Sequence, residues 1–495
     1  MVFRGGDTIY KNSKKIKSLR IAIIGLDGLS PGILAILVNK IRLPNLSKIV
    51  KNSYFRVLKS IPPTTMVGWT SIITGVNPAF HGIFGFTKYY INSASHIVSQ
   101  LYNSYDVRAP RLFEMSALFG LKSIVVNYPL TYPINGLHLI NDNMMIISDS
   151  LSSPRIQYYP SILKKYSQYF EKFEDLVQRV ELMSEGVLKI ANDFDWNLLI
   201  SVFDVPDKFF HIDIMSTLRV EGRVRHVFYI IDRFIGKLKK ISDILIIVSD
   251  HGLGIYRKWV NPISLLLARG IIPGKYKFSE KLARNILEII YGSKCSFIIH
   301  PFIHKLAVSQ IISKNSLFGE ETSVDNTEIM IDEINTQDTW IIYFKDPMFR
   351  EKVYSYLKNY NEFFDVFRLE DFFKGPFLPK IPSLIIIPHY QKGIYLSYMK
   401  PKLFSKLDFS YRISGSHHPD GVLIAYGKDI KKSINLSKYV TVYDIVPTIL
   451  SLFGLPIPKK TDGNILPISG RIRKIKRYNY DLMIKLFRIK RIKRY

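Results

Sequence analysis

Short apolar runs alternate with longer amphipathic stretches along the first half of this chain. The apolar runs have the length and composition of buried β-strands and occupy residues 20–26, 53–60, 121–129, 195–207 and 241–252. Stretches with helical patterning separate them, at residues 109–119, 161–193 and 221–240. Strands that alternate with helices indicate an α/β fold built on a largely parallel sheet.

Cap residues mark where two of the expected helices begin. After the first apolar run, Ser30 is placed as an N-cap, with Pro31 at the first helical position. After the second run, Thr64 or Thr65 precedes a helical pattern that Gly75 closes. Both helices follow the carboxyl end of a strand, which is the edge where open α/β sheets bind their ligands.

The alternation stops near residue 255 and returns after residue 410. The segment between mixes basic, aromatic and proline-rich pieces, which indicates an insertion or cap. The returning part contains a strand in GVLIAYGKDI and a helix in YDIVPTILSLFGLP, which Gly454 and Pro456 end. The predicted organisation is a basic N-terminal extension (1–18), a catalytic core in two parts (19–254 and 411–468), the cap between them (255–410) and a basic tail (469–495).

The composition argues against several classes of protein. No run approaches the roughly 20 apolar residues that a membrane-spanning helix needs, and the N-terminal apolar run is short for a signal peptide. Cys295 is the only cysteine, which excludes an intrachain disulfide framework and a cysteine-based zinc cage. We expect Cys295 to be a small buried residue and the protein to be cytoplasmic.

The formal net charge of +28 is typical of proteins that meet anionic partners. Its densest part is residues 471–495, which contain eleven Lys or Arg residues and one acid. Apolar residues interleave with these cations, which predicts an amphipathic basic helix that contacts anionic lipid or nucleic acid. With lipid as the partner, the protein would lie peripherally at a membrane. A solvated tail of a generally basic protein is the alternative.

Acidic residues and histidines follow three of the expected strands. These strand-end groups are Asp27, Asp207 with His211, and Asp250 with His251. A later pair, His417 and His418, stands in SGSHHPDG close to Asp420. A single strand-end aspartate is ordinarily a cap or turn residue. Three such ends, two of them with a histidine, indicate instead a site for Zn²⁺ or a related divalent ion.

Two metals a few ångströms apart suit phosphoryl transfer, because together they stabilise the attacking and the leaving oxygen. Such a reaction also needs a nucleophile, and a threonine hydroxyl serves only when its pKa is lowered. Thr65 is the candidate, since it comes at a helix start directly after a strand. The alternative interpretation of Thr65 is an ordinary N-cap.

The same segments resemble, in order, the type I phosphodiesterase/nucleotide pyrophosphatase family of the alkaline phosphatase superfamily. The likeness is carried by IIGLDGLSP, LPNL, PPTTMVGWTSIITGVNPAFHGIFGF, VVNYPLTYPINGLHLI, DWNLLISVFDVPDKFFH, IIVSDHGLG, SGSHHPDGVLIAYG and YDIVPTILSLFGLPIPKKTDG. It covers most of the chain and gives little guidance within 255–410. It implies an alkaline-phosphatase-like three-layer α/β/α sandwich with a largely parallel central sheet and an inserted cap region.

The resemblance also implies a role for each site residue. One metal would be bound by Asp27, Asp250, His251 and the nucleophile oxygen of Thr65, and the other by Asp207, His211 and His417. Two divalent ions are expected, with zinc favoured over manganese or magnesium by the histidine content. Thr64 is the alternative nucleophile, and His418 matches no ligand position.

One position departs from the family pattern. Relatives often carry an asparagine three positions after the nucleophile, where it contacts a phosphoryl oxygen, and this chain has Gly68 there. A backbone amide or a cap residue would have to take that role, which argues against classical nucleotide pyrophosphatase activity. Sulfatase activity is disfavoured too, because Cys295 lies in no C/S-x-P-x-R motif.

We therefore predict a metal-dependent phosphodiesterase or phosphohydrolase that cleaves phosphodiester or pyrophosphate bonds of a small phosphoester, nucleotides included. The resemblance implies two steps, in which Thr65 attacks phosphorus and water then hydrolyses the phospho-threonine. A phosphomonoesterase or a phosphoglycerate-mutase-like transferase on the same scaffold is one alternative. A basic protein that binds nucleic acid or a membrane surface and carries a vestigial metal site is the other.

Overall fold

The computed structural model describes residues 19–271 (except 94, 154 and 257), 322–324, 329–331, 339–396, 414–470 and 476–492. The N-terminal extension 1–18 and Cys295 lie outside these residues, so the predictions made for them stay predictions. Within the described residues, none of the helices combines the length and the apolar character needed to cross a membrane.

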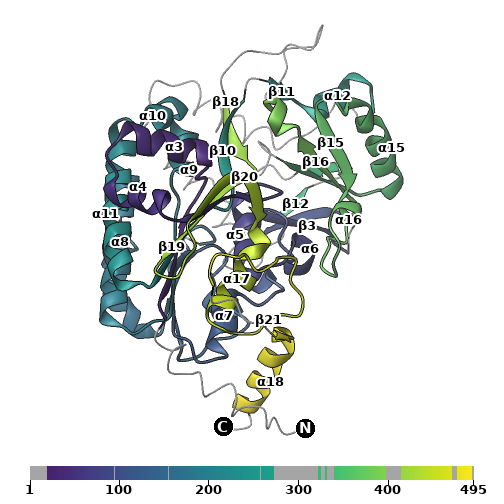
Figure 1. Ribbon diagram of the computed structural model, residues 1–495. Helices are drawn as coiled ribbons and strands as arrows, with labels where there is room; N and C mark the ends of the chain where they lie inside the picture. The colour runs from purple at the N-terminus through teal and green to yellow at the C-terminus, as the bar shows by residue number, and fades with distance from the viewer. Residues whose placement is uncertain are drawn as a thin grey trace.

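A nine-stranded sheet forms the centre of the molecule, with the strand order β20-β2-β19-β9-β1-β8-β5-β6-β7 (Figure 1). The strands are β1 Ile21–Leu26, β2 Tyr54–Lys59, β5 Ser123–Tyr128, β6 Met144–Ser148, β7 Tyr158–Tyr159, β8 Leu198–Phe203, β9 Ile244–Val248, β19 Asp420–Gly427 and β20 Ser433–Thr441. Only the pairs made by β19 and β7 are antiparallel. The predicted, largely parallel α/β sheet is therefore confirmed.

Helices cover both faces of this sheet and complete three layers (Figure 1). One face carries α3 (Pro31–Lys40), α4 (Pro44–Lys51), α8 (Leu176–Asp193) and α11 (Gly222–Ile241), and the other carries α5 (Thr65–Thr74), α7 (Leu112–Ala117) and α17 (Ile445–Leu452). Successive side chains of a strand point to opposite faces, so β1 sends Ala22 and Ile24 into one core and Ile21 and Ile23 into the other. Burial on both faces explains why these strands are apolar throughout.

The two helix starts after β1 and β2 follow the local signals. The Ser30 hydroxyl accepts a hydrogen bond from the Ile33 amide at 3.2 Å, and Pro31 is the first residue of α3. Gly75 ends α5 with a φ of 73°, a left-handed conformation that favours glycine. Both helices begin next to the carboxyl end of a strand, which places their amino termini beside the candidate site.

The patterning of 161–193 suggested one helix, but the structure has two separate helices there. A 3₁₀ helix spans Ser161–Tyr169, and α8 starts separately at Leu176. The reason is a new N-cap, because the Asp175 side chain accepts a hydrogen bond from the Gln178 amide at 2.9 Å.

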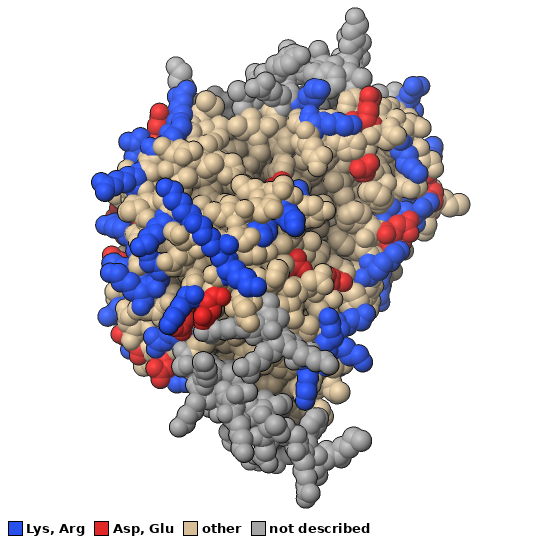
Figure 2. All heavy atoms as spheres, in the orientation of Figure 1, with Lys and Arg blue, Asp and Glu red and all other residues tan. Residues whose placement is uncertain are grey.

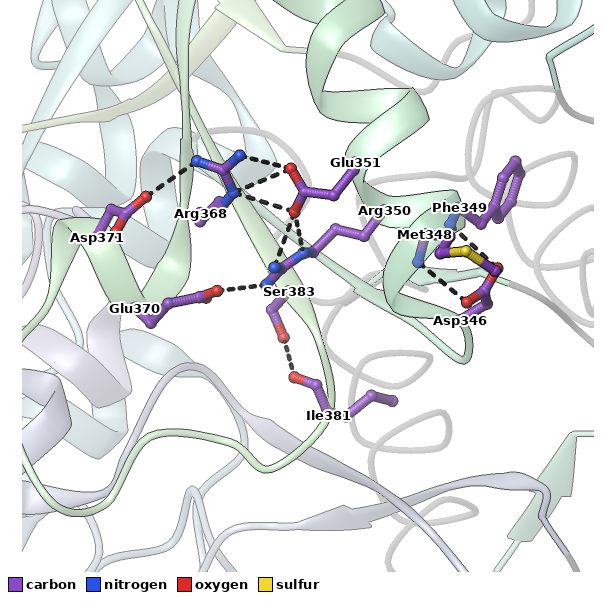
Figure 3. A network of polar contacts seen from close by, with 10 residues as sticks. All are labelled: Asp346, Met348, Phe349, Arg350, Glu351, Arg368, Glu370, Asp371, Ile381 and Ser383. Carbon is purple, nitrogen blue, oxygen red and sulfur yellow. Dashed lines mark hydrogen bonds and ion pairs between the residues drawn. The ribbon is translucent and has the colours of Figure 1, made fainter.

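Four strands in the described part of 255–410 form a second sheet with the order β13-β14-β16-β15. Its strands are β13 Ile329–Ile331, β14 Trp340–Phe344, β15 Phe364–Arg368 and β16 Ser383–Pro388, and α15 (Pro347–Leu357) packs beside them. Figure 3 shows Arg368 of β15 donating to both carboxylate oxygens of Glu351 on α15, while Arg350 reaches Glu370. These half-exposed ion pairs orient α15 on the sheet more than they stabilise it. The boundaries 255 and 410 remain a prediction.

Candidate metal site

The carboxyl ends of three adjacent parallel strands bring the acidic residues together. β1 lies between β8 and β9, and the three strands run in register. Asp27 follows β1 directly, Asp250 comes two residues after β9, and Asp207 begins α9 (Asp207–Ile212) just after β8. His211 lies one helical turn further along α9. The pattern of strand-end residues therefore does converge on a single edge of the sheet.

Asp27, Asp250 and His251 form a buried cluster in which one ligand atom from each lies within 4.8 Å of the others. The Nε2 atom of His251 is 3.4 Å from Asp27 Oδ1 and 3.3 Å from Asp250 Oδ2. The other ring nitrogen, Nδ1, lies 3.0 Å from the Gly252 carbonyl oxygen, which turns Nε2 toward the carboxylates. Thr65 Oγ1, at the amino terminus of α5, lies 3.4 Å from the same Nε2 atom.

Two imidazoles contact the third carboxylate, Asp207. The Nε2 atoms of His211 and His417 lie 3.2 and 3.3 Å from Asp207 Oδ1, and 3.0 Å from each other. His417 Nδ1 lies 2.9 Å from the Pro63 carbonyl oxygen, which fixes the orientation of this ring as Gly252 fixes that of His251.

A short ribbon joins the two groups of ligands. β18 (Ser414–His418) pairs antiparallel with β10 (Gly252–Tyr256), the strand that starts directly after His251. The His251 and His417 rings stack with their centroids 3.9 Å apart, and Asp207, His251 and His417 also meet within 4.8 Å. His251 therefore contacts the ligands of both groups, so the Asp27 group and the Asp207 group adjoin.

The electrostatics of the clusters call for a bound cation. Burial raises the pKa of Asp27, and the nearby Asp250 carboxylate raises it further. The pKa of Asp250 is raised by burial and then by Asp207. At Asp207 burial also acts upward, but His211 and the second imidazole hold its pKa well below the ordinary value. Carboxylates gathered in this way repel one another unless they take up protons or bind positive charge, and a bound cation would relieve the repulsion while the carboxylates stay ionised.

Three buried carboxylate oxygens at this site accept no hydrogen bond from an amide or a hydroxyl and have imidazole nitrogens as neighbours. They are Asp27 Oδ1, Asp207 Oδ1 and Asp250 Oδ2. A buried carboxylate oxygen that no amide or hydroxyl binds is costly, and these three point into the space that the imidazoles also face. Carboxylate oxygens, together with the Nε2 atoms of imidazole rings that backbone carbonyls orient through Nδ1, form a donor set that suits a divalent ion such as zinc.

The first turn of α5 packs directly against this cluster. Trp69 Nε1 donates to Asp27 Oδ2 at 3.3 Å, and the Gly28 amide lies 3.4 Å from Asp250 Oδ1. A Cβ atom at Gly68 would lie only 2.7 Å from the Asp250 carbonyl oxygen. The position where relatives often carry asparagine therefore has no room for a side chain, because α5 approaches the Asp250 backbone too closely.

The two adjacent threonines have different surroundings. Thr64, not Thr65, occupies the N-cap position of α5, so the interpretation of Thr65 as an N-cap is wrong. The Thr64 hydroxyl makes no capping hydrogen bond and is buried without a hydrogen-bond partner. Thr65 begins the helix, and its hydroxyl is the one that contacts His251.

His418 lies beside the site and outside both clusters. Its Nδ1 atom accepts a hydrogen bond from the Asp420 amide at 3.2 Å, and its ring packs near the rings of Tyr256 and Tyr390. Trp69 was missed by sequence reasoning, although its place one helical turn after Thr65 is a signal that could have revealed it.

The chain resembles known proteins in sequence and in structure. A model of the family described as type I phosphodiesterase / nucleotide pyrophosphatase matches residues 21–420. An inactive threonine-to-alanine variant of murine ectonucleotide pyrophosphatase / phosphodiesterase 5, in complex with AMP, is 14% identical with a TM-score of 0.54, over 92% of this chain and 97% of that one. Phosphonoacetate hydrolase from Sinorhizobium meliloti 1021, in complex with phosphonoformate, is 14% identical with a TM-score of 0.57, over 86% and 94%. No curated protein matches.

The structural likenesses, at low identity, confirm the predicted alkaline-phosphatase-like sandwich. The family match spans most of the chain and includes every residue of the two clusters and Thr65. The protein is therefore a hydrolase of phosphoester bonds, and the chain belongs to the type I phosphodiesterase / nucleotide pyrophosphatase family.

Proposed function

We propose that this hydrolase is a two-metal phosphodiesterase with Thr65 as its nucleophile. The observation that carries the proposal is the convergence of two buried carboxylates, one partly buried carboxylate and three imidazoles at one sheet edge, where three carboxylate oxygens accept no hydrogen bond from an amide or a hydroxyl. A threonine hydroxyl at the start of a helix lies against this group. That combination suits phosphoryl transfer better than it suits a structural metal site, which would not need the hydroxyl.

The clusters divide naturally into two binding sites. Asp27, Asp250 and His251 would hold one divalent ion, and Asp207, His211 and His417 the other. The imidazole content favours zinc over manganese or magnesium. When bound, such ions lower the pKa of a nearby hydroxyl and neutralise charge that develops on the attacking and leaving oxygens.

The amino terminus of α5 supplies the groups that would hold the phosphoryl oxygens. The Gly68 amide donates to the Thr64 carbonyl oxygen, so it is the first amide of the helix with an intrahelical partner. The preceding amides of Thr65, Met66 and Val67 are the free donors of a helix amino terminus, which binds anions well. These amides take over the contact to an equatorial oxygen that an asparagine at position 68 would make.

In the proposed reaction, Thr65 Oγ1 attacks phosphorus, its new bond to phosphorus forms, and the bond from phosphorus to the leaving oxygen breaks. The leaving alkoxide takes up a proton, and the threonine proton is released to water. A water molecule then attacks the phospho-threonine, its proton is released, and the threonine hydroxyl is regenerated. One diester and one water become an alcohol and a phosphomonoester, with retained configuration at phosphorus after two inversions.

The substrate is a small phosphoester, with nucleotides among the candidates. AMP is the ligand in the murine phosphodiesterase structure, and phosphonoformate is the ligand in the phosphonoacetate hydrolase structure. Both folds thus accept small anions that contain phosphorus. The inactivity of the threonine-to-alanine variant of the murine protein supports a threonine nucleophile in this chain as well.

Metal analysis combined with an activity panel tests this proposal. We expect two divalent ions per chain, and faster hydrolysis of bis-p-nitrophenyl phosphate than of p-nitrophenyl phosphate. Thr65→Ala should lower kcat at least about 1,000-fold with its metal content retained, because the nucleophile is lost. Thr64→Ala is the matched control and should stay within about tenfold of the wild type.

Two outcomes contradict the proposal directly. They are a wild-type protein that binds no divalent metal and a Thr65→Ala variant that keeps full activity. Preferential hydrolysis of p-nitrophenyl phosphate would assign the site to phosphomonoesters instead. Salt-sensitive nucleic-acid binding without metal-dependent turnover would point to a vestigial metal site.

A further inference from the structure

The C-terminal helix α18 (Tyr480–Ile492) is attached to the body of the protein by one face. Tyr480 and Ile484 are each 3% exposed and belong to the hydrophobic core beneath α5 and α17. The Tyr480 hydroxyl donates to the Pro456 carbonyl oxygen at 2.6 Å, and its ring meets Phe119 edge-on with the centroids 6.1 Å apart. The helix therefore has a fixed place on the molecule.

The opposite face of α18 carries an exposed apolar stripe. Leu482, Leu486 and Ile489 are 52, 41 and 50% exposed. Their spacing of four and then three residues places them on one side of a helix. Since a helix turns about 100° per residue, this stripe lies about 180° from Tyr480 and Ile484. Single exposed apolar residues are common on soluble proteins, whereas a continuous stripe marks an interaction surface.

The stripe lies in the most cationic part of the chain. Residues 471–495 hold eleven Lys or Arg residues against one acid, and the exposed Lys485 flanks the stripe. Above the region of grey atoms in Figure 2, Lys and Arg side chains are interspersed with acidic and uncharged residues. The tail thus combines two features, a dense positive charge and an apolar helix face.

We propose that α18 docks the protein on an anionic lipid surface. The stripe would enter the boundary between headgroups and acyl chains, while Lys485 and the other cations of the tail contact the negatively charged headgroups. A nucleic acid would pair with the cations and leave the stripe in water. A second copy of the helix would cover the stripe and bring two strongly cationic tails together. Of these occupants, the lipid surface alone accommodates both features.

Docking through α18 would leave the metal site facing away from the lipid. Phe119, whose ring contacts Tyr480, precedes β5. Arg488 Nη2 of α18 donates to the Leu137 carbonyl oxygen at 3.1 Å, and Leu137 precedes β6. Both contacts lie at the amino ends of the parallel strands, the edge opposite the metal ligands, and Figure 1 shows α18 far from β10 and β18. Strands of this length span roughly 20 Å. This part of the inference rests on the proposed function: the substrate would come from water, not from the bilayer.

Vesicle flotation of the full chain tests the docking. The wild type should float with phosphatidylglycerol vesicles and not with phosphatidylcholine vesicles. The triple variant Leu482→Gln, Leu486→Gln, Ile489→Gln keeps the cations and should bind at least about tenfold more weakly, because the apolar contribution is lost. The control variant Ile162→Gln, Met215→Gln, Met348→Gln changes three exposed apolar residues elsewhere and should bind as the wild type does.

Thermal unfolding of each variant shows that it is folded, which is expected because the changed side chains are exposed. Equal binding by the triple variant, or no flotation of the wild type with anionic vesicles, would overturn the docking. Binding of a DNA duplex that the triple variant retains, with no vesicle binding, would assign the tail to nucleic acid. Hydrolysis of bis-p-nitrophenyl phosphate should be unchanged by vesicles. A rate that falls on vesicle binding would overturn the orientation and leave both the docking and the proposed chemistry standing.

Discussion

A single methyl group added at Gly68 should disturb both the stability and the activity of this protein. In Gly68→Ala the new Cβ would lie 2.7 Å from the Asp250 carbonyl oxygen and 2.9 Å from Asp250 Cβ. Ordinary contact begins at 3.4 Å, so α5 or the Asp250 segment must move by about 0.7 Å. Overpacking of this kind costs about 1–3 kcal/mol of the free energy of unfolding.

The same displacement would separate Thr65 from the ligands that it faces. A misplacement approaching 1 Å at a reacting group costs up to about 100-fold in rate, so we expect kcat for the diester to fall by about 10- to 100-fold. The measurements are steady-state kinetics, metal content and urea unfolding. Gly32→Ala is the matched control, because Gly32 is also helical and the nearest atom to its Cβ would be Ser30 Oγ at 3.9 Å. This control should keep its activity.

Two results would refute the reasoning about Gly68. If Gly68→Ala matched the wild type in both kcat and free energy of unfolding, the close approach of α5 to Asp250 would not exist in solution. If only the stability fell, the strain would be relieved away from Thr65, and Gly68 would have no part in placing the nucleophile.

Two further predictions concern buried polar groups outside the metal site. Burial lowers the pKa of His81 from its ordinary value of 6.5 to about 3. Unfolding therefore takes up a proton when the pH is below 6.5. Through this group, the free energy of unfolding should fall by about 2 kcal/mol from pH 7 to pH 5. His81→Asn should remove that component from urea unfolding curves, and an unchanged pH dependence would contradict it. The buried Glu114 carboxylate accepts hydrogen bonds from the Arg111, His138 and Leu139 amides. Glu114→Ala should therefore lower the free energy of unfolding by about 3–5 kcal/mol. A loss below about 1 kcal/mol would show that these donors bind water in the variant.

The layers of the fold and the edge that carries the site were predictable from local patterns. Apolar runs such as the one that ends before Ser249 are buried on both faces, and a sheet covered by helices on both sides provides that environment. Once the strands are parallel, their carboxyl ends must share an edge, so Asp27 and Asp250 had to lie at the same edge. The helix start at Ser30 was equally local, because an N-cap depends on residues three positions apart.

The parts that depend on distant pairing were not predictable in this way. β19 enters the sheet antiparallel between β9 and β2, and no local pattern states where a late strand inserts. His417 reaches the site because β18 pairs with β10 across more than 150 residues, and only the family resemblance pointed to it. The Pro63 carbonyl that orients His417 belongs to a third segment, and backbone carbonyls carry no mark in a sequence.

The charge of the chain and the charge of its site have opposite signs, and the proposed function explains why both are needed. The net charge of +28 attracts anionic phosphoesters to the protein. The three carboxylates of Asp27, Asp207 and Asp250 would repel the same substrates at the point of reaction, and burial makes that repulsion stronger. Two divalent ions would exceed the charge of these carboxylates and make the site attractive to an anion. Metal should therefore govern substrate binding as well as the chemical step, so removal of the metal with a chelator should abolish binding of an inert phosphonate analogue as well as turnover.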